Sequence, residues 1–320
     1  MTFDVIIGNP PYQEEDEGHG ASATPIYNYF VTQAKKINPQ YLTMIIPARW
    51  YAGGKGLDSF RDEMLHDDRL RVIHDFIRAD SCFPNVEIKG GVCYFLWDRD
   101  NKGLCKVCTH LENKTISQAE RPLLEKGANT FIRLNDAIPV LRKVQAKKEK
   151  SFSKIVSSRK PFGFPTNFTD YSDSDFPNAV KIFANQKIGY IERDKINVNT
   201  SWVDKWKVYV PVATGVGNIQ TDWLKPILGE PNTCSTETYV VLGTYDSKTQ
   251  AENVISYIQT KFFHLFLSFK KITQHTTNKV YSYIPLQDFN EAWTDEKLYT
   301  KYDLSPDEIT FIERTIRPLD

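Results

Sequence analysis

The sequence predicts an α/β fold for residues 1–145 and an α+β fold for residues 146–320. In the first part, short apolar runs alternate with helical patterns, which is typical of a parallel sheet covered by helices. From about residue 151 this alternation stops, and irregular β segments are followed by helical patterns. A chain of 320 residues, 41% hydrophobic and 25% charged, is long and apolar enough for two globular domains.

One strand of the first part is central to the prediction. Residues 4–8, with the sequence DVIIG, form an apolar run that ends in glycine, as expected of a buried parallel strand. A helix follows, capped by Thr24 with Pro25 in its first turn, and its apolar face is predicted to consist of Ile26, Tyr29, Phe30 and Ala34. Further strands are predicted over 41–48, 72–77, 91–97 and 104–110, with a helix over 60–65.

The second part is predicted from weaker patterns. Segments 161–165 and 207–212 indicate irregular β structure. One long helix is expected over about 248–270, where phenylalanines recur at helical spacing. Near the end of the chain, Ser305 and Glu308 form a capping box around Pro306, which predicts the start of a last helix.

The tetrapeptide Asn9-Pro10-Pro11-Tyr12 directly follows the first strand and contains no nucleophile, metal ligand or general base. Asn9 offers a side-chain carbonyl oxygen, Pro10 a backbone carbonyl without a competing N–H, and Tyr12 a flat aromatic face. Ligands bind at the carboxyl ends of parallel strands, so these groups are predicted to hold a planar amino group still. A strand-ending turn, which would also use two prolines, is the competing interpretation.

Residues 3–12 resemble the catalytic motif of amino-methyltransferases that use S-adenosylmethionine (SAM). They are most similar to the adenine-N6 DNA methyltransferases of type II, especially IIG, restriction–modification systems. The resemblance implies the C-terminal half of a Rossmann-like methyltransferase sheet in residues 1–145 and a target-recognition (DNA specificity) domain in residues 146–320. It also implies catalytic roles for Asn9, Pro10, Pro11 and Tyr12.

In this family an aromatic residue at a Phe-Pro step stacks on the flipped target adenine. Phe83 precedes Pro84 and matches that position, so the resemblance implies that Tyr12 and Phe83 sandwich the base. The alternative interpretation of Phe83 is an ordinary core or loop aromatic.

Methylases of glutamine side chains and of RNA bases carry the same tetrapeptide. Segments 157–164, 281–289 and 293–299 are similar to the recognition domains that follow the catalytic domain in DNA methyltransferases, whereas that of the glutamine methylases would precede it. We therefore expect double-stranded DNA as the substrate. Two alternatives stay open: a methylase of RNA or protein, and a DNA-specificity module that is inactive alone and acts with a partner chain.

The resemblance implies SAM as the cofactor, with most of its binding site missing from this chain. Family members carry a Gly-containing loop and acidic cofactor ligands ahead of the motif strand, but only a few residues precede it here. The Val5–Ile7 strand is therefore expected to form a sheet edge with half-uncovered apolar faces. We hypothesise a truncated or split enzyme, completed by a second polypeptide that supplies the cofactor-binding half.

Charge alone does not indicate a nucleic-acid binder, because 40 basic residues balance 40 acidic ones. Two local clusters are candidates for phosphate contacts. The first lies where the two parts join and contains Lys147, Lys148, Lys150, Arg159 and Lys160; the second contains Lys270 and Lys271. A solvated helix face and linker explain the first cluster equally well.

Cys105, Cys108 and His110 have the spacing of half a zinc site, but segment 104–110 reads more simply as a strand, so no metal is predicted. The five scattered cysteines favour a reducing, cytoplasmic environment. No apolar run reaches the ~20 residues of a membrane span, and we expect no membrane partner.

Overall fold

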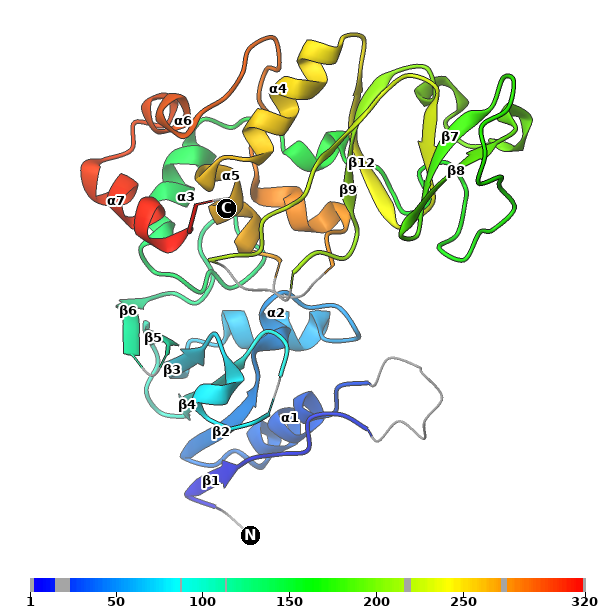
Figure 1. Ribbon diagram of the computed structural model, residues 1–320. Helices are drawn as coiled ribbons and strands as arrows, with labels where there is room; N and C mark the ends of the chain where they lie inside the picture. Colours follow the sequence, from blue (N-terminus) through cyan, green and yellow to red (C-terminus); the bar gives the residue numbers. More distant parts are fainter. Residues whose placement is uncertain are drawn as a thin grey trace. The chain divides into compact units, whose positions relative to one another are not determined.

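The computed structural model describes residues 3–14, 24–86, 88–112, 114–215, 220–271 and 275–318. The chain forms two compact units, Met1–Pro139 and Val140–Asp320 (Figure 1). The division lies slightly before the predicted boundary after residue 145. The functions assigned to the two halves stay predictions.

The first unit is built on a six-stranded sheet in the order β1-β2-β4-β3-β5-β6. Strand β1 pairs in parallel with β2, and β3 pairs in parallel with β5, but β4 is antiparallel to both of its neighbours and β6 is antiparallel to β5. The strands are β1 (Val5–Gly8), β2 (Tyr41–Pro47), β3 (Leu70–Phe76), β4 (Val92–Asp98), β5 (Cys105–Leu111) and β6 (Lys114–Arg121).

The predicted α/β class is therefore confirmed, but the prediction of a parallel sheet is wrong at β4 and β6. A parallel neighbour requires a crossover connection, usually a helix. Between β3 and β4 the described chain contains only the short 3-10 helix η2 (Ala79–Ser81), and only two residues separate β5 from β6. Both connections suit antiparallel pairing.

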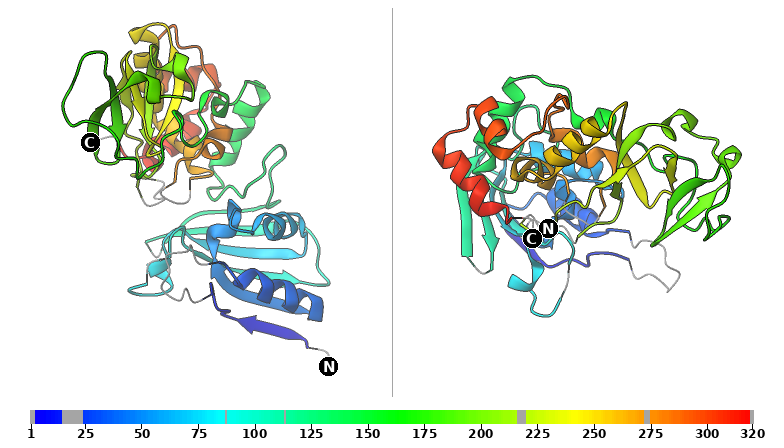
Figure 2. Two further views of the ribbon diagram at one scale, coloured as in Figure 1. Left: turned by 90° about the vertical axis from the view of Figure 1, so that its right-hand side faces the viewer. Right: turned by 45° about the horizontal axis from the view of Figure 1, so that its top comes forward.

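Helices α1 (Tyr27–Ile37) and α2 (Asp58–His66) pack on one face of this sheet (Figure 2). The buried residues of α1 include Tyr27, Val31 and Ala34, which join side chains of β2, β3 and β4 in one hydrophobic core. Following β2, the 3-10 helix η1 (Ala48–Tyr51) adds Trp50 and Tyr51 to this core.

The predicted start of α1 is wrong, and its predicted apolar face is right at Ala34 but wrong at Tyr29 and Phe30. The backbone N–H of Ile26 donates to the Tyr12 carbonyl, which keeps this segment extended, and the helix begins only at Tyr27. Tyr29 and Phe30 point away from the core and are 61% and 44% exposed.

Strand β1 is the outermost strand of the sheet, as expected. Ile6 packs against the core, whereas Val5 and Ile7 lie on the opposite face and are 48% and 77% exposed. Tyr94 of β4 lies on that same face and is also exposed. The edge strand is therefore covered on one face only.

The second unit contains two three-stranded sheets, β10-β9-β12 and β11-β7-β8. Strand β9 confirms the predicted β segment at 207–212. The strands are β7 (Val180–Ala184), β8 (Lys187–Ile191), β9 (Trp206–Pro211), β10 (Ile227–Gly229), β11 (Thr233–Ser235) and β12 (Tyr239–Tyr245).

Its helices are α3 (Ala137–Ala146), which crosses the division between the units, α4 (Lys248–Ile258), α5 (Lys261–Ser268), α6 (Asp295–Lys301) and α7 (Pro306–Thr315), with short 3-10 helices η3 (Phe152–Ile155), η4 (Arg193–Lys195), η5 (Thr200–Trp202) and η6 (Asn278–Tyr283). The single helix predicted over 248–270 is wrong, because α4 ends with Gln259 as its C-cap and Thr260 then caps the start of α5. The capping box of Ser305 and Glu308 is confirmed at the start of α7. None of the described helices is long and apolar enough to cross a membrane.

Candidate active site

The candidate site lies at the carboxyl ends of three strands of the six-stranded sheet. Strands β1, β2 and β3 run in the same direction, because β4 is antiparallel to both β2 and β3. Their carboxyl ends therefore share an edge, where the tetrapeptide follows β1, η1 follows β2, and residues 77–91 follow β3. Such edges are the usual ligand sites of open α/β sheets.

Asn9 and Pro10 leave β1 with two oxygen acceptors available. The Asn9 side chain is exposed, and neither its carboxamide nor the Pro10 carbonyl is hydrogen-bonded to any residue that the structure describes. Pro10 itself is buried and Pro11 is exposed. These oxygens can accept N–H donors of a ligand without first breaking a bond among the described residues.

Tyr12 is fixed at both its backbone and its ring. Its carbonyl accepts a bond of 3.2 Å from the Ile26 N–H, and its ring packs against the core of the unit. Burial, with smaller contributions from the thiols of Cys93 and Cys82, raises the pKa of Tyr12 to about 12. The phenol is therefore neutral in ordinary buffers, which suits a stacking role better than proton transfer.

Phe83 comes from the segment after β3 and is half-buried. Its ring centroid lies 6.4 Å from that of Tyr12, with an angle of 73° between the ring planes. A base between two parallel rings needs roughly 7 Å, twice a contact distance of about 3.5 Å. The structure thus brings the two predicted rings together, but in an edge-to-face arrangement, and a sandwich requires one ring to turn.

Two buried charges near this edge were missed by the sequence analysis. Asp75 of β3 is completely buried and pairs with Arg133, whose side chain is 6% exposed. An aspartate within the apolar run 72–77 is a signal that a buried partner exists, because buried charges are rarely unpaired. The partner lies 58 residues away, and no spacing rule locates it.

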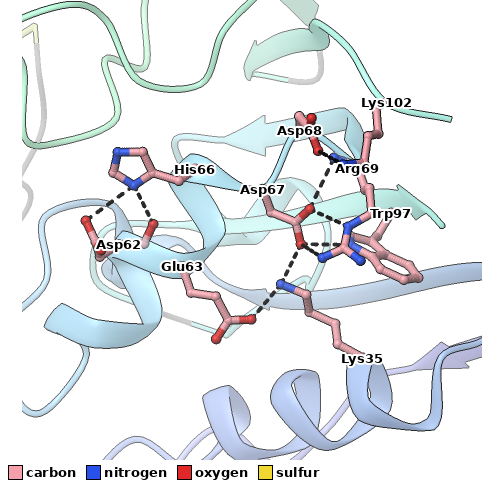
Figure 3. Close-up of polar contacts among 9 residues, drawn as sticks. All are labelled: Lys35, Asp62, Glu63, His66, Asp67, Asp68, Arg69, Trp97 and Lys102. Carbon is pink, nitrogen blue, oxygen red and sulfur yellow. Dashed lines mark hydrogen bonds and ion pairs between the residues drawn. The ribbon is translucent and has the colours of Figure 1, made fainter. Parts of the chain in front are cut away.

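The helix after the tetrapeptide is anchored by a second cluster of charges (Figure 3). Lys35, near the end of α1, pairs with Asp67 and with Glu63 of α2, each at 2.7 Å. Asp67 also accepts hydrogen bonds from Arg69 and from the indole N–H of Trp97, at 2.7 and 2.9 Å. This cluster ties α1 to α2 and to the sheet.

The side chains of Cys105, Cys108 and His110, which have the spacing of half a zinc site, do not come together. Alternation along β5 places Cys105 on one face of the sheet and Cys108 and His110 on the other. Within the described ranges no three His, Cys, Asp or Glu side chains are grouped so that they could hold a metal.

The first cluster of candidate phosphate contacts lies in the second unit and is exposed. Lys147 pairs with Asp303 at 3.2 Å and Arg159 with Glu237 at 3.1 Å, whereas Lys148, Lys150 and Lys160 have exposed side chains.

The two lysines of the second cluster of candidate phosphate contacts, Lys270 and Lys271, have different environments. Lys270 is half-buried, with its ammonium 5.2 Å from the ring centre of Tyr283. Lys271 is 4% exposed and pairs with Asp222 at 2.8 Å. Lys271 therefore belongs to the interior of the unit and is not placed to meet a phosphate.

Residues 1–83 match the family described as Eco57I restriction-modification methylase. The match contains both the tetrapeptide and Phe83. A curated relative, an uncharacterized adenine-specific methylase of Mycoplasma pneumoniae (strain ATCC 29342 / M129), is 40% identical over 119 residues, which is 36% of this chain and 28% of the relative.

The fold is similar to that of MmeI, a type IIL restriction-modification enzyme whose structure was solved in complex with DNA. The TM-score is 0.52 at 9% identity, over 98% of this chain and 52% of MmeI, so the likeness concerns the fold alone. The type IIG restriction endonuclease BpuSI agrees less well, with a TM-score of 0.38 at 12% identity over 97% of this chain and 48% of BpuSI, too low to support an argument. The chain thus spans about half the length of MmeI and just over a quarter of its curated relative.

Proposed function

We propose that this chain carries the adenine-binding side of a site-specific DNA adenine-N6 methyltransferase of a restriction–modification system. The observation that carries the proposal is the set of groups after β1: two available oxygens, on Asn9 and Pro10, beside the paired rings of Tyr12 and Phe83. The match of residues 1–83 to a methylase family supports it.

The proposed chemistry depends on positioning. A target adenine flipped out of duplex DNA stacks on Tyr12 and Phe83, which recovers about 1–3 kcal/mol per aromatic contact against a few kcal/mol for unstacking. The Asn9 side-chain oxygen and the Pro10 carbonyl each accept one N6–H bond. The nitrogen lone pair is thereby directed to one side of the base, ready to form the new N–C bond.

SAM, when bound, would supply an electrophilic methyl group: its bond to sulfur would break as the N6 lone pair forms the new N–C bond, S-adenosylhomocysteine would leave, and one of the two N6 protons would pass to solvent. The described residues fit the acceptor half of this reaction but not the cofactor. Along β1 and just before it, the exposed side chains are Phe3, Asp4, Val5 and Ile7, of which only Asp4 offers oxygens to a ribose or an amino group, too few for a complete cofactor site. We therefore propose that a further segment or a second polypeptide covers β1 and supplies most of the SAM site.

The second unit is proposed to read the DNA sequence. The exposed cations Lys147, Lys148, Lys150, Arg159 and Lys160 are candidates for phosphate contacts, joined by the half-buried Lys270. Loss of one of them should weaken DNA binding at every sequence alike and reduce its salt dependence, because phosphate contacts carry no base information.

Replacing Asn9 with alanine tests the proposal. Asn9→Ala should lower methyl transfer to DNA by about 10²- to 10³-fold, as expected for loss of one well-placed transition-state hydrogen bond. Affinity for DNA should hardly change, because Asn9 contacts only the flipped base. Incorporation of label from SAM, by this chain together with the segment or polypeptide that covers β1 and with DNA, RNA and protein offered as acceptors, measures the rate and the substrate class.

The neighbouring variant Gln13→Ala is the matched control, since Gln13 is exposed and lies just outside the tetrapeptide. Full activity of Asn9→Ala would sink the proposal. The second candidate function is a DNA-specificity module that is inactive alone and acts with a partner chain, and the exposed edge of β1 favours it. This function replaces the proposed one if the wild-type chain binds DNA specifically but transfers no methyl group to any of the acceptors.

A further inference from the structure

The segment that carries Phe83 is held at both ends by one guanidinium group. Arg133 donates from Nε and Nη2 to the two carboxylate oxygens of Asp75, at 2.7 and 2.6 Å, and from Nη1 to the Gly90 carbonyl, at 2.9 Å. Asp75 lies in β3 just before the segment leaves the sheet, and Gly90 lies just before the segment enters β4. Arg133 therefore bridges the start and the end of residues 77–91.

The surroundings of this bridge leave little freedom. The Arg133 carbonyl accepts a bond of 2.5 Å from the hydroxyl of Thr109, and the guanidinium lies 5.6 Å from the centre of the Tyr51 ring. Next to Gly90, Gly91 has a φ of +81°, and a Cβ there would meet the Phe76 carbonyl oxygen at 2.0 Å. The ends of the segment are packed too closely to shift independently of one another.

We propose that Arg133 and Asp75 are positioning residues for the target base: by fixing the ends of residues 77–91 they hold the Phe83 ring opposite Tyr12. The clamp on the segment follows from the contacts alone, whereas its effect on the base rests on the proposed function. A planar guanidinium can serve two carboxylate oxygens and a carbonyl at once, and a lysine ammonium cannot reproduce this fork.

The chain provides a matched control at the other end of β3. Arg69 donates to both oxygens of Asp67, from Nε at 2.7 Å and from Nη2 at 3.1 Å. Arg69→Lys therefore removes the same kind of forked contact from the same unit. It does so at the start of β3, whereas the Phe83 segment follows the end of that strand. Because Arg69 is more exposed than Arg133, 35% against 6%, thermal unfolding of both variants is measured alongside, and faster exchange confined to the Phe83 segment, with the rest of the unit unchanged, is an effect of position and not of lost stability.

The first measurement is hydrogen exchange by mass spectrometry on the full chain, in the wild type and both lysine variants. Arg133→Lys should speed exchange in residues 79–91 on the order of tenfold while Arg69→Lys leaves it unchanged. Equal exchange of this segment in all three proteins overturns the clamp. If Arg133→Lys does not fold, Asp75→Asn, which keeps the shape of the side chain and weakens the pair, takes its place.

The second measurement uses duplexes that are first selected from a random-sequence pool by binding to the wild-type chain and then made with 2-aminopurine in place of each adenine in turn, because the fluorescence of 2-aminopurine rises when the base leaves the DNA stack. Arg133→Lys should lose most of the rise seen with the wild type at unchanged DNA affinity, and Arg69→Lys should keep it. If Arg133→Lys shows the normal rise in fluorescence together with faster hydrogen exchange, the clamp on the segment is supported, but its role in holding the base is refuted. No rise with the wild type contradicts the proposed function itself, and the exchange result then stands alone.

Discussion

At the scale of single residues, the candidate site uses groups that accept or stack, not groups that ionise. Asn9 and Pro10 contribute neutral oxygens, and the raised pKa of Tyr12 keeps its phenol neutral. The charged residues of this unit have a supporting role, since Asp75 and Asp67 form pairs that hold surrounding elements in place. Substituting one of these charged residues should therefore lower the free energy of unfolding.

Asp67→Asn should destabilise the first unit by about 2–3 kcal/mol, because Lys35 and Arg69 lose their shared carboxylate. Burial works to raise the pKa of Asp67, but hydrogen bonds from Arg69 and Lys35 outweigh it and hold this pKa below its ordinary value. The unfolded chain then binds the proton more readily, so the stabilisation is complete above about pH 4 and is lost as the pH falls further. Thermal unfolding of both proteins between about pH 2 and 7 measures this.

The difference in stability between wild type and Asp67→Asn should shrink towards low pH. A constant difference across the whole range would show that the lost contacts are not those of the ionised carboxylate. Asp62→Asn is a suitable control, because its carboxylate is exposed and pairs with His66 on the surface of α2.

At the scale of secondary-structure elements, the break between α4 and α5 shows how a local polar group overrides an apolar pattern. The Thr260 hydroxyl accepts a bond of 3.1 Å from the Phe263 N–H, and Asp295 of α6 accepts from Lys261 and Phe262, at 2.9 and 2.8 Å. The start of α5 is thus satisfied from two sides, which one continuous helix would not allow.

Thr260→Ala should lower the free energy of unfolding by about 1 kcal/mol, the usual loss for an N-cap side chain. Thr260→Ser keeps the hydroxyl and should stay close to the wild type. Chemical denaturation followed by circular dichroism compares the three proteins. An alanine variant as stable as the wild type would mean that Asp295 alone suffices to cap α5.

Local sequence patterns were enough to predict the strands β2 to β5 almost to their ends, since each is a short apolar run bounded by polar residues. They were also enough to predict the capping box of α7. What they could not supply depends on distant partners. The direction of β4 is set by pairing with β2 and β3, the exposed side of α1 depends on which face the sheet offers, and Asp75 meets Arg133 only after folding.

At the scale of the whole molecule, the first unit presents the proposed acceptor side and an open strand edge beside it. Val5 and Ile7 on β1 and Tyr29 and Phe30 on α1 expose apolar side chains on either side of the sheet edge. Isolated exposed apolar residues are ordinary, but a group beside the open edge of an outermost strand marks a surface that another element can cover.

Calorimetric titration of the purified chain with SAM, alone and with duplex DNA, tests this at the molecular scale. We expect no measurable binding by the chain alone, because Asp4 is the one exposed carboxylate among the described residues 3–9, too few polar groups to hold the cofactor. Micromolar binding would contradict the proposal that another segment or polypeptide supplies the cofactor site.

The uncovered edge of β1 also has a consequence for the cell that makes this chain. A strand with one open edge and protruding valine and isoleucine is a template for other nascent chains and a target for chaperones and proteases. Under the proposal that a second polypeptide covers β1, chains produced in excess of that polypeptide would be lost to aggregation or degradation. The abundance of the proposed assembly would then be set by its scarcer component, and balanced synthesis would become a condition for activity.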